Sequence, residues 1–179
     1  MADGRCLLVL GGARSGKSRY AEARAEAAGA RLCYIATAEA NDEEMADRIA
    51  HHRARRGSSW ATVEAPLELP GAIAEAAGDD TALLVDCLTL WLSNLILAER
   101  DPDAEADRLI ASVRHAGGTI ILVSNEVGLG IVPDNALARR FRDAAGLANQ
   151  RVAGIADEVV LVTAGLPLTL KGGPGDISR

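Results

Sequence analysis

The stretch Gly11-Gly12-Ala13-Arg14-Ser15-Gly16-Lys17-Ser18 decides how this sequence is interpreted. It follows an apolar run at residues 6–10 and precedes an alanine-rich segment that predicts a helix. This is the pattern G-x-x-x-x-G-K-[ST], in which backbone N–H groups and a helix N-terminus surround phosphate oxygens. Lys17 is expected to reach the β- and γ-phosphates, and the Ser18 hydroxyl is expected to bind Mg²⁺. The alternative is a glycine-rich turn that binds nothing, but loop, lysine, hydroxyl and flanking elements all agree on a nucleoside-phosphate site.

Length and composition describe a single globular domain. The chain has 179 residues, of which 49% are hydrophobic and only 3% aromatic, so its core must be aliphatic. We expect one catalytic domain over residues 1–171 and a flexible tail over 172–179. The net charge of −6 argues against non-specific nucleic-acid binding, which needs a basic surface.

The cysteines and the lengths of the apolar runs indicate the cellular compartment in which the protein is expected. Cys6, Cys33 and Cys87 lie in apolar runs without a C-x-x-C pair, which predicts buried thiols in a reducing environment. No signal peptide is visible, and no apolar stretch approaches the ~20 residues that a membrane span needs. A cytoplasmic protein without a membrane span is therefore expected.

Short apolar runs alternate with helix-like segments along the chain. Strands are expected at residues 6–10, 32–37, 60–64, 81–86, 119–124 and 158–162, with a short antiparallel edge strand at 166–170. Helices are expected at residues 17–28, 41–57, 66–77, 89–99, 102–115 and 135–156. This alternation predicts an α/β fold, a three-layer α/β/α P-loop domain whose mostly parallel sheet is covered on both faces. Ligands then bind outside the carboxyl ends of the strands.

The apolar run at residues 81–85 ends in an acid, Asp86. A carboxylate at a strand's carboxyl end has the form of a Walker B residue, which lies near Mg²⁺. The alternative is a buried strand that ends at a helix-capping aspartate. Beside the glycine-rich loop, the metal-binding interpretation is favoured.

A basic segment at residues 48–56 stands out in this acidic chain, since six of its nine residues are cationic or imidazole. His52 shares a helical stripe with Met45 and Ile49, which predicts that it points toward the body of the protein. A neutral imidazole beside a triphosphate can attack the α-phosphorus, and the arginines can hold phosphate charge. The alternative is a solvated helix face.

These stretches resemble the bifunctional adenosylcobinamide kinase / adenosylcobinamide-phosphate guanylyltransferase family of cobalamin assembly. The motifs appear in family order and cover nearly the whole chain. They are the glycine-rich loop, Tyr34-Ile35-Ala36-Thr37, Arg48-Ile49 through His52-Arg53 to Trp60, Val85-Asp86-Cys87-Leu88-Thr89, residues 125–133, and Arg140-Phe141-Arg142-Asp143-Ala144-Ala145-Gly146 with Asn149-Gln150.

The resemblance implies two reactions. ATP or GTP phosphorylates the aminopropanol hydroxyl of adenosylcobinamide, and GMP then passes from GTP to that phosphate through a guanylylated histidine. In the family that histidine precedes a basic residue and lies eight residues before a tryptophan, which selects His52 over His51. Adjacent helical positions point about 100° apart, so only one of the two can face the nucleotide. The resemblance also implies a homo-oligomer, such as a trimer.

The resemblance further implies the nucleotide contacts. They are Gly11, Gly12, Ala13, Arg14, Ser15, Gly16, Lys17, Ser18, Ala36, Thr37, Ala38, Arg53, Ala54, Arg55, Arg56, Glu64 and Asp86. Lys17, with Mg²⁺ on Ser18 and Asp86, would serve the kinase step. His52 must be unprotonated to attack; an imidazole with a pKa of ~6.5 is mostly neutral at pH 7, and nearby guanidiniums favour that form. Glu126 is open to two interpretations, substrate contact or loop anchor.

Two rival functions fit the glycine-rich loop. One is an ordinary small-molecule P-loop kinase in which the basic segment is only a lid, and it would form no covalent nucleotide adduct. The other is a regulatory nucleotide-binding module, which would turn over GTP slowly whether or not cobinamide is present.

Overall fold

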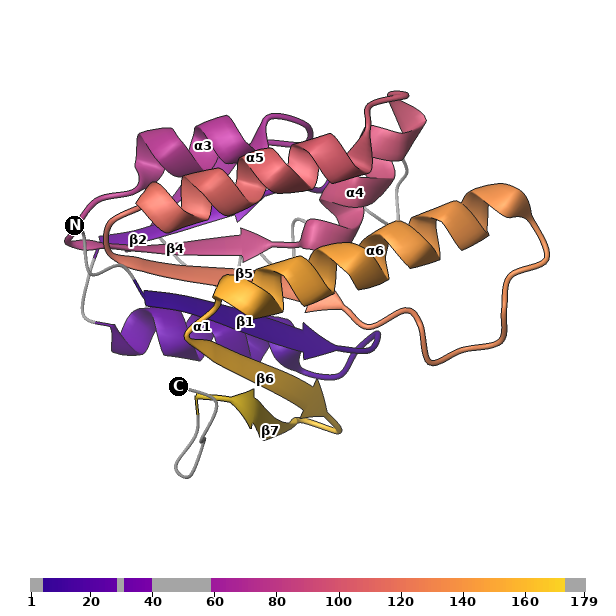
Figure 1. Cartoon of the computed structure of the whole chain (residues 1–179). Coiled ribbons are helices and arrows are strands. Elements are labelled where there is room, and N and C mark those ends of the chain that lie inside the picture. The colour runs from indigo at the N-terminus through magenta and orange to yellow at the C-terminus, as the bar shows by residue number, and fades with distance from the viewer. Residues whose placement is uncertain (1–4, 29–30, 40–58, 173–179) are drawn as a thin grey trace.

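The computed structural model describes residues 5–28, 31–39 and 59–172, and within them a seven-stranded sheet forms the centre (Figure 1). Its strand order is β3-β2-β4-β5-β1-β6-β7, with every neighbouring pair parallel except the antiparallel pair β6 and β7. The strands are β1 (Arg5–Gly11), β2 (Arg31–Ala36), β3 (Trp60–Glu64), β4 (Thr81–Asp86), β5 (Thr119–Asn125), β6 (Glu158–Thr163) and β7 (Leu166–Lys171).

Helices cover both faces of this sheet. They are α1 (Lys17–Ala27), α3 (Leu69–Ala76), α4 (Leu88–Leu97), α5 (Pro102–His115) and α6 (Ala136–Ile155). Among these, α1 packs on one face and the other four lie on the opposite face (Figure 1). The predicted three-layer α/β/α fold with a mostly parallel sheet is confirmed. The helix predicted at residues 41–57 lies outside the described residues.

The central strands are apolar because both of their faces are buried. Along β5, alternate side chains enter two clusters: Ile120 and Leu122 pack with α3, α4, α5 and α6, whereas Ile121 and Val123 pack with α1. The two longest helices that the structure describes, α5 and α6, begin at capping side chains. The Asn135 side chain accepts a hydrogen bond from the Ala138 N–H at 2.7 Å and so caps α6.

The edge of the sheet is a tight hairpin between β6 and β7. Its two turn residues, Ala164 and Gly165, have φ of 51° and 78°, the left-handed pair that a two-residue hairpin requires. This turn contacts the glycine-rich loop, because the Gly165 N–H donates to the Ser15 carbonyl at 2.9 Å. The predicted antiparallel edge strand is therefore confirmed, and it also supports the loop.

Several smaller predictions can be compared with the structure. All seven strands lie within about two residues of their predicted bounds, which is the usual uncertainty of such boundaries. Cys6, Cys33 and Cys87 are buried free thiols, as predicted. No helix among the described residues is long and apolar enough to cross a membrane. The predicted tail at 172–179 lies outside the described residues except for Gly172.

Candidate active site

Three strands bring the predicted phosphate and metal groups to one edge of the sheet. The glycine-rich loop follows β1 and Asp86 ends β4, while β5 lies between these two strands (Figure 1). Side chains two residues apart on a strand share a face. Val9 and Leu84 both belong to the cluster that packs with α1, so Gly11 and Asp86 lie on that same face. The loop and the carboxylate therefore flank one space above the sheet, next to the start of α1.

The glycine-rich loop has the backbone of an anion cradle. Arg14 and Gly16 have φ of 54° and 96°, which turns successive N–H groups toward a common centre. Gly16 is also the N-cap of α1, so the positive end of the helix dipole faces the loop. Lys17 Nζ donates to the Gly12 carbonyl at 3.1 Å, which holds the ammonium against the loop.

Asp86 and Ser18 provide the kind of ligands that a hard cation takes. Asp86 is half-buried at the end of β4, and Ser18 is half-buried in the first turn of α1. Mg²⁺ prefers oxygen ligands, and it usually takes one or two from the protein and the rest from phosphates and water. Within the described ranges no group of three or more His, Cys, Asp or Glu side chains forms a metal cage. The donor set therefore suits a cation that arrives with a nucleotide.

Thr37 holds β2 to the start of α4. Its side chain is fully buried; the Thr37 Oγ1 donates to the Cys87 carbonyl at 2.7 Å and accepts from the Cys87 N–H at 2.8 Å. The Thr37 carbonyl accepts from Asn94 Nδ2 at 2.8 Å. Burial, followed by the neighbouring Asp86 charge, raises the pKa of the Cys87 thiol above its ordinary value, so this cysteine stays protonated. These bonds give Thr37 a structural role; its predicted nucleotide contact stays a prediction.

A second polar network, which we did not predict from the sequence, lies at the end of β5. The Asn125 Nδ2 donates to Thr89 Oγ1 at 2.7 Å, and the Asn125 backbone N–H reaches the same oxygen at 3.2 Å. Thr89 Oγ1 lies 3.1 Å from Cys87 Sγ, so the network continues to the residue after Asp86. Thr89 and Asn125 lie in the motifs at residues 85–89 and 125–133 that carry the family resemblance, but no local pattern showed that their side chains meet.

The Glu126 carboxylate anchors the loop that follows β5. Its Oε1 accepts from the Gly128 N–H at 2.6 Å, and the Glu126 backbone N–H donates to the Gly11 carbonyl at 3.1 Å. Of the two interpretations left open for Glu126, the structure shows the contacts of a loop anchor. Beyond it, Leu129 and Ile131 are almost fully exposed, at 88% and 98%.

The remaining predicted nucleotide contacts divide into two groups. Ala36 and Glu64 are the last residues of the neighbouring strands β2 and β3, and Ala38 follows β2, so all three lie at the same sheet edge as Asp86. The predicted nucleophile and its basic neighbours lie outside the described residues. They are His52, Arg53, Ala54, Arg55 and Arg56.

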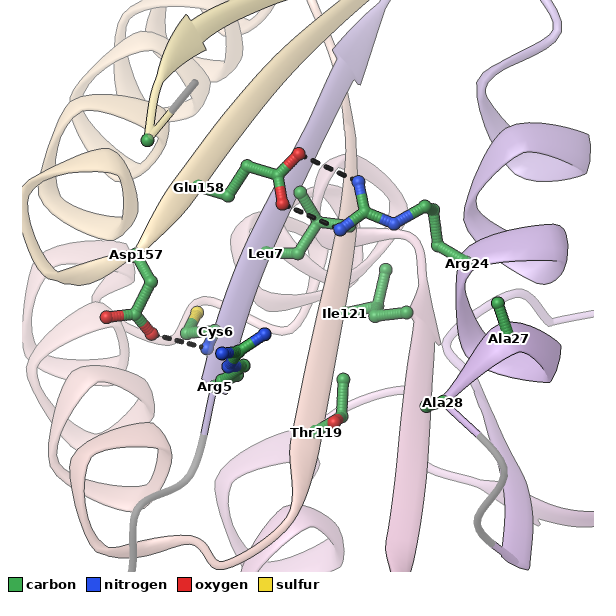
Figure 2. Close-up of a pocket in the computed structure, with 11 residues that line it drawn as sticks. Arg5, Cys6, Leu7, Arg24, Ala27, Ala28, Thr119, Ile121, Asp157 and Glu158 are labelled. Atoms are coloured by element: carbon green, nitrogen blue, oxygen red, sulfur yellow. Dashed lines mark hydrogen bonds and ion pairs between the residues drawn. The ribbon is translucent and has the colours of Figure 1, made fainter. Parts of the chain in front are cut away.

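A large cavity of about 820 Å³ lies elsewhere, at the amino ends of β1, β5 and β6 (Figure 2). Arg24 crosses it to Glu158 with two hydrogen bonds of 2.8 and 2.6 Å. The Cys6 N–H donates to Asp157 at 2.8 Å, and burial, with the Asp157 charge, raises the pKa of the Cys6 thiol to about 12. Because ligands of parallel sheets bind at the carboxyl edge, this cavity is not the phosphate site.

Comparison with known proteins agrees with this geometry. The family model for cobinamide kinase / cobinamide phosphate guanyltransferase matches residues 7–170. The chain belongs to this family. Its relatives include the bifunctional adenosylcobalamin biosynthesis protein CobP of Pseudomonas aeruginosa, 51% identical over 93% of this chain and 98% of that one.

Two CobU proteins of the same description are further relatives of this family member. The one from Salmonella typhimurium is 44% identical and the one from Escherichia coli 42%; each match covers 92% of this chain and 99% of the relative. A KaiC-like protein from Pyrococcus horikoshii aligns with a TM-score of 0.47 at 14% identity, over 88% of this chain and 70% of that one. The family model and the three sequence relatives confirm the resemblance inferred from the motifs.

Proposed function

We propose that this protein phosphorylates the aminopropanol hydroxyl of adenosylcobinamide with ATP or GTP, then transfers GMP from GTP to that phosphate to give adenosylcobinamide-GDP. The observation that carries the proposal is the family match over residues 7–170, because the family's description names both a kinase and a guanyltransferase. The phosphate cradle beside Asp86 supports the nucleotide-dependent chemistry that both reactions share.

In the kinase step the chain's own groups position the phosphates. The backbone N–H groups of residues 11–18 surround the phosphate oxygens, and the Lys17 ammonium moves from the Gly12 carbonyl to the β- and γ-phosphates. Phosphoryl transfer requires little acid–base chemistry, so positioning and charge neutralisation provide most of the acceleration. Lys17 therefore acts as a catalytic residue by electrostatic stabilisation.

Mg²⁺ is the cofactor that the donor set suits. We assign it to the Ser18 hydroxyl and the Asp86 carboxylate, two oxygen donors on the same face of the sheet edge. When bound with the nucleotide, it neutralises charge on the β- and γ-phosphate oxygens. Asp86 would hold this cation at the carboxyl end of β4.

In the transferase step we assign His52 as the nucleophile. The imidazole nitrogen forms a bond to the α-phosphorus of GTP, the bond to the β-phosphate oxygen breaks, and pyrophosphate leaves with that electron pair. A phosphate oxygen of the phosphorylated cobinamide then displaces the histidine. Arg53, Arg55 and Arg56, with the intervening Ala54, would hold the phosphates, and Ala36, Thr37, Ala38 and Glu64 would complete the nucleotide site.

A homo-oligomer, such as a trimer, is part of the proposal. The segment after β5 supports it with exposed apolar side chains at Leu129, Ile131 and Val132. In Figure 1 this segment and the first turns of α6 extend beyond the carboxyl edge of the sheet. Large apolar side chains exposed close together in the sequence are what an interface between subunits would cover. Light scattering should give a mass of about three times 18.6 kDa for a trimer.

The test of the function is direct. The full chain is incubated with Mg²⁺, GTP and adenosylcobinamide, and mass spectrometry measures the phosphorylated product and the GDP product. A second assay uses α-³²P-GTP to label the protein: His52→Ala should lose the label and His51→Ala should keep it. Label retained on His52→Ala would overturn the nucleophile assignment, and phosphorylation without any labelled protein would support the simple kinase instead.

A further inference from the structure

Asn125 occupies the place between the phosphate loop and the metal-binding carboxylate. Strand β5 lies between β1 and β4, where Asn125 pairs with Gly11 and Val123 pairs with Asp86. Asn125 is therefore one strand nearer to the loop than Asp86, and it lies two residues beyond the level of Asp86 toward the carboxyl edge of the sheet. With strands ~4.8 Å apart and ~3.3 Å per residue, the two Cα atoms are separated by about 8 Å.

The side chains of these residues also share a face of the sheet. Val123 packs in the cluster with α1, so Asn125, two residues later, projects to the α1 side. Gly11 and Asp86 lie on that side as well, and so does the Lys17 turn of α1. Asn125 thus lies on the same face of the sheet as the loop and Asp86, at the carboxyl end of the strand between them.

Thr89 fixes the orientation of the Asn125 carboxamide. The Thr89 hydroxyl oxygen accepts from the Asn125 N–H at 3.2 Å and from Asn125 Nδ2 at 2.7 Å, which uses both of its lone pairs. The Thr89 oxygen also lies 3.1 Å from Cys87 Sγ, a contact in which either atom can be the donor. Among the residues that the structure describes, no hydrogen bond involves Asn125 Oδ1, so the atom left for a ligand is an acceptor.

Because Asn125 Oδ1 can only accept a hydrogen bond, the ligand group that it contacts must be a hydrogen-bond donor. Phosphate oxygens at neutral pH carry negative charge and only accept, whereas an alcohol hydroxyl donates. From this position and polarity we infer that Asn125 is a catalytic residue of the kinase step, whose Oδ1 accepts a hydrogen bond from the acceptor hydroxyl and orients its oxygen toward the γ-phosphorus. This inference rests on the proposed function.

The role is one of orientation, because a carboxamide is not basic. The hydroxyl oxygen forms a bond to the γ-phosphorus, the bond between that phosphorus and the bridging oxygen breaks, and the nucleoside diphosphate leaves with the electron pair. The hydroxyl proton passes to bulk water as the new bond forms, which suits a loose transition state with little early deprotonation. The guanylyl transfer has no alcohol acceptor and does not use this hydrogen bond.

The two reactions provide an internal control for the test. Phosphorylation of adenosylcobinamide with Mg²⁺ and ATP is measured beside GMP transfer to chemically supplied adenosylcobinamide phosphate, on the same preparation of each variant. Asn125→Ala should lower kcat of phosphorylation by about 30-fold, and leave GMP transfer within about three-fold of the wild type. A merely structural role would lower both rates together.

Further variants test the hydrogen bonds by which Thr89 orients the Asn125 carboxamide. Thr89→Val should lower phosphorylation by about five-fold, and the double variant should be no slower than Asn125→Ala, since both act through one hydrogen bond. Asn149→Ala is the matched control: Asn149 Nδ2 donates to the Asn125 backbone carbonyl at 3.3 Å, and among the described residues no hydrogen bond joins it to the Asn125 carboxamide, so the ratio of the two rates should stay at the wild-type value.

Two results would overturn the inference while leaving the proposed function intact: equal loss of both reactions in Asn125→Ala, or undiminished phosphorylation. A wild-type protein that lacks phosphorylation would instead refute the proposed function itself. The outcomes of the two claims are therefore separable.

Discussion

Replacing Gly11 with alanine should destabilise the protein through a clash between two strands. A Cβ on Gly11 would lie 2.5 Å from the Val162 carbonyl oxygen and 2.5 Å from Ser15 Oγ. The serine hydroxyl can rotate away, but the carbonyl belongs to β6, which pairs with β1 at this position. Since ordinary contact begins at 3.4 Å, β1 and β6 must move apart locally by 3.4 minus 2.5, or about 0.9 Å.

The size of the expected loss of stability follows from the rigidity of the Val162 backbone, which cannot rotate away from the new methyl group. Overpacking a well-packed interior costs about 1–3 kcal/mol, and a backbone obstacle places Gly11→Ala in the upper half of that range. For a domain of this size each kcal/mol corresponds to ~2–4 °C in Tm, so we expect a decrease of roughly 4–12 °C. Gly12→Ala is the matched control, because nothing lies within 4 Å of its added Cβ and its φ is not left-handed.

Urea denaturation without nucleotide measures the effect, since the phosphate loop contributes no ligand energy under those conditions. Gly12→Ala should change the free energy of unfolding by less than about 1 kcal/mol in either direction. Equal midpoints for the two variants, at equal m-values, would refute the reasoning, because only the Gly11 substitution meets backbone.

Three further predictions concern buried or charged groups. Thr37→Val should lower the free energy of unfolding by about 2–4 kcal/mol in thermal or urea melts, because the Cys87 N–H and carbonyl lose their buried partner; a loss below 1 kcal/mol would contradict this. Hydrogen bonding to Arg24 lowers the pKa of Glu158, so the pair stabilises above the unfolded pKa and its contribution is lost as pH falls through the folded pKa. Glu158→Gln should therefore be less stable than the wild type by ~0.5–1 kcal/mol at about pH 7, and this difference should shrink as pH falls through the folded pKa of Glu158; a pH-independent difference would argue against the ion pair. The three cysteines should resist a thiol reagent at about pH 8 until urea unfolds the chain, since all are buried and the pKa of Cys6 is raised to about 12; a fast-reacting thiol in the native protein would count against this.

Local patterns in the sequence were sufficient for the elements and the phosphate loop. Apolar runs bounded by glycine or polar residues marked the strands, because a parallel strand buried on both faces must be apolar along its length. The loop motif was equally clear, since its glycines, lysine and hydroxyl must stand at fixed spacing to surround a phosphate. The assignment of His52 rests on its helical stripe and on the family resemblance, since residues 40–58 lie outside the described part of the chain.

Contacts between distant segments could not be predicted in this way. Nothing local shows that β5 separates β1 from β4, so the position of Asn125 between the loop and Asp86 followed only from strand order and register. The hydrogen bond from the Gly165 N–H to the Ser15 carbonyl could not be predicted either, because it joins residues 150 positions apart in the chain. The hydrogen bonds between the Thr37 hydroxyl and Cys87, fifty residues away, could not be predicted either, whereas the nucleotide contact of Thr37 stays a prediction.

The sequence by itself therefore determined the fold class, the phosphate cradle and the family, because each depends on the order and spacing of neighbouring residues. The tertiary structure decided which polar side chains stand together at the sheet edge and which of their atoms remain for a ligand. The physical reason is that hydrogen-bond partners such as Thr89 and Asn125 are chosen by strand pairing across the chain, and strand pairing is a long-range property that no short pattern contains.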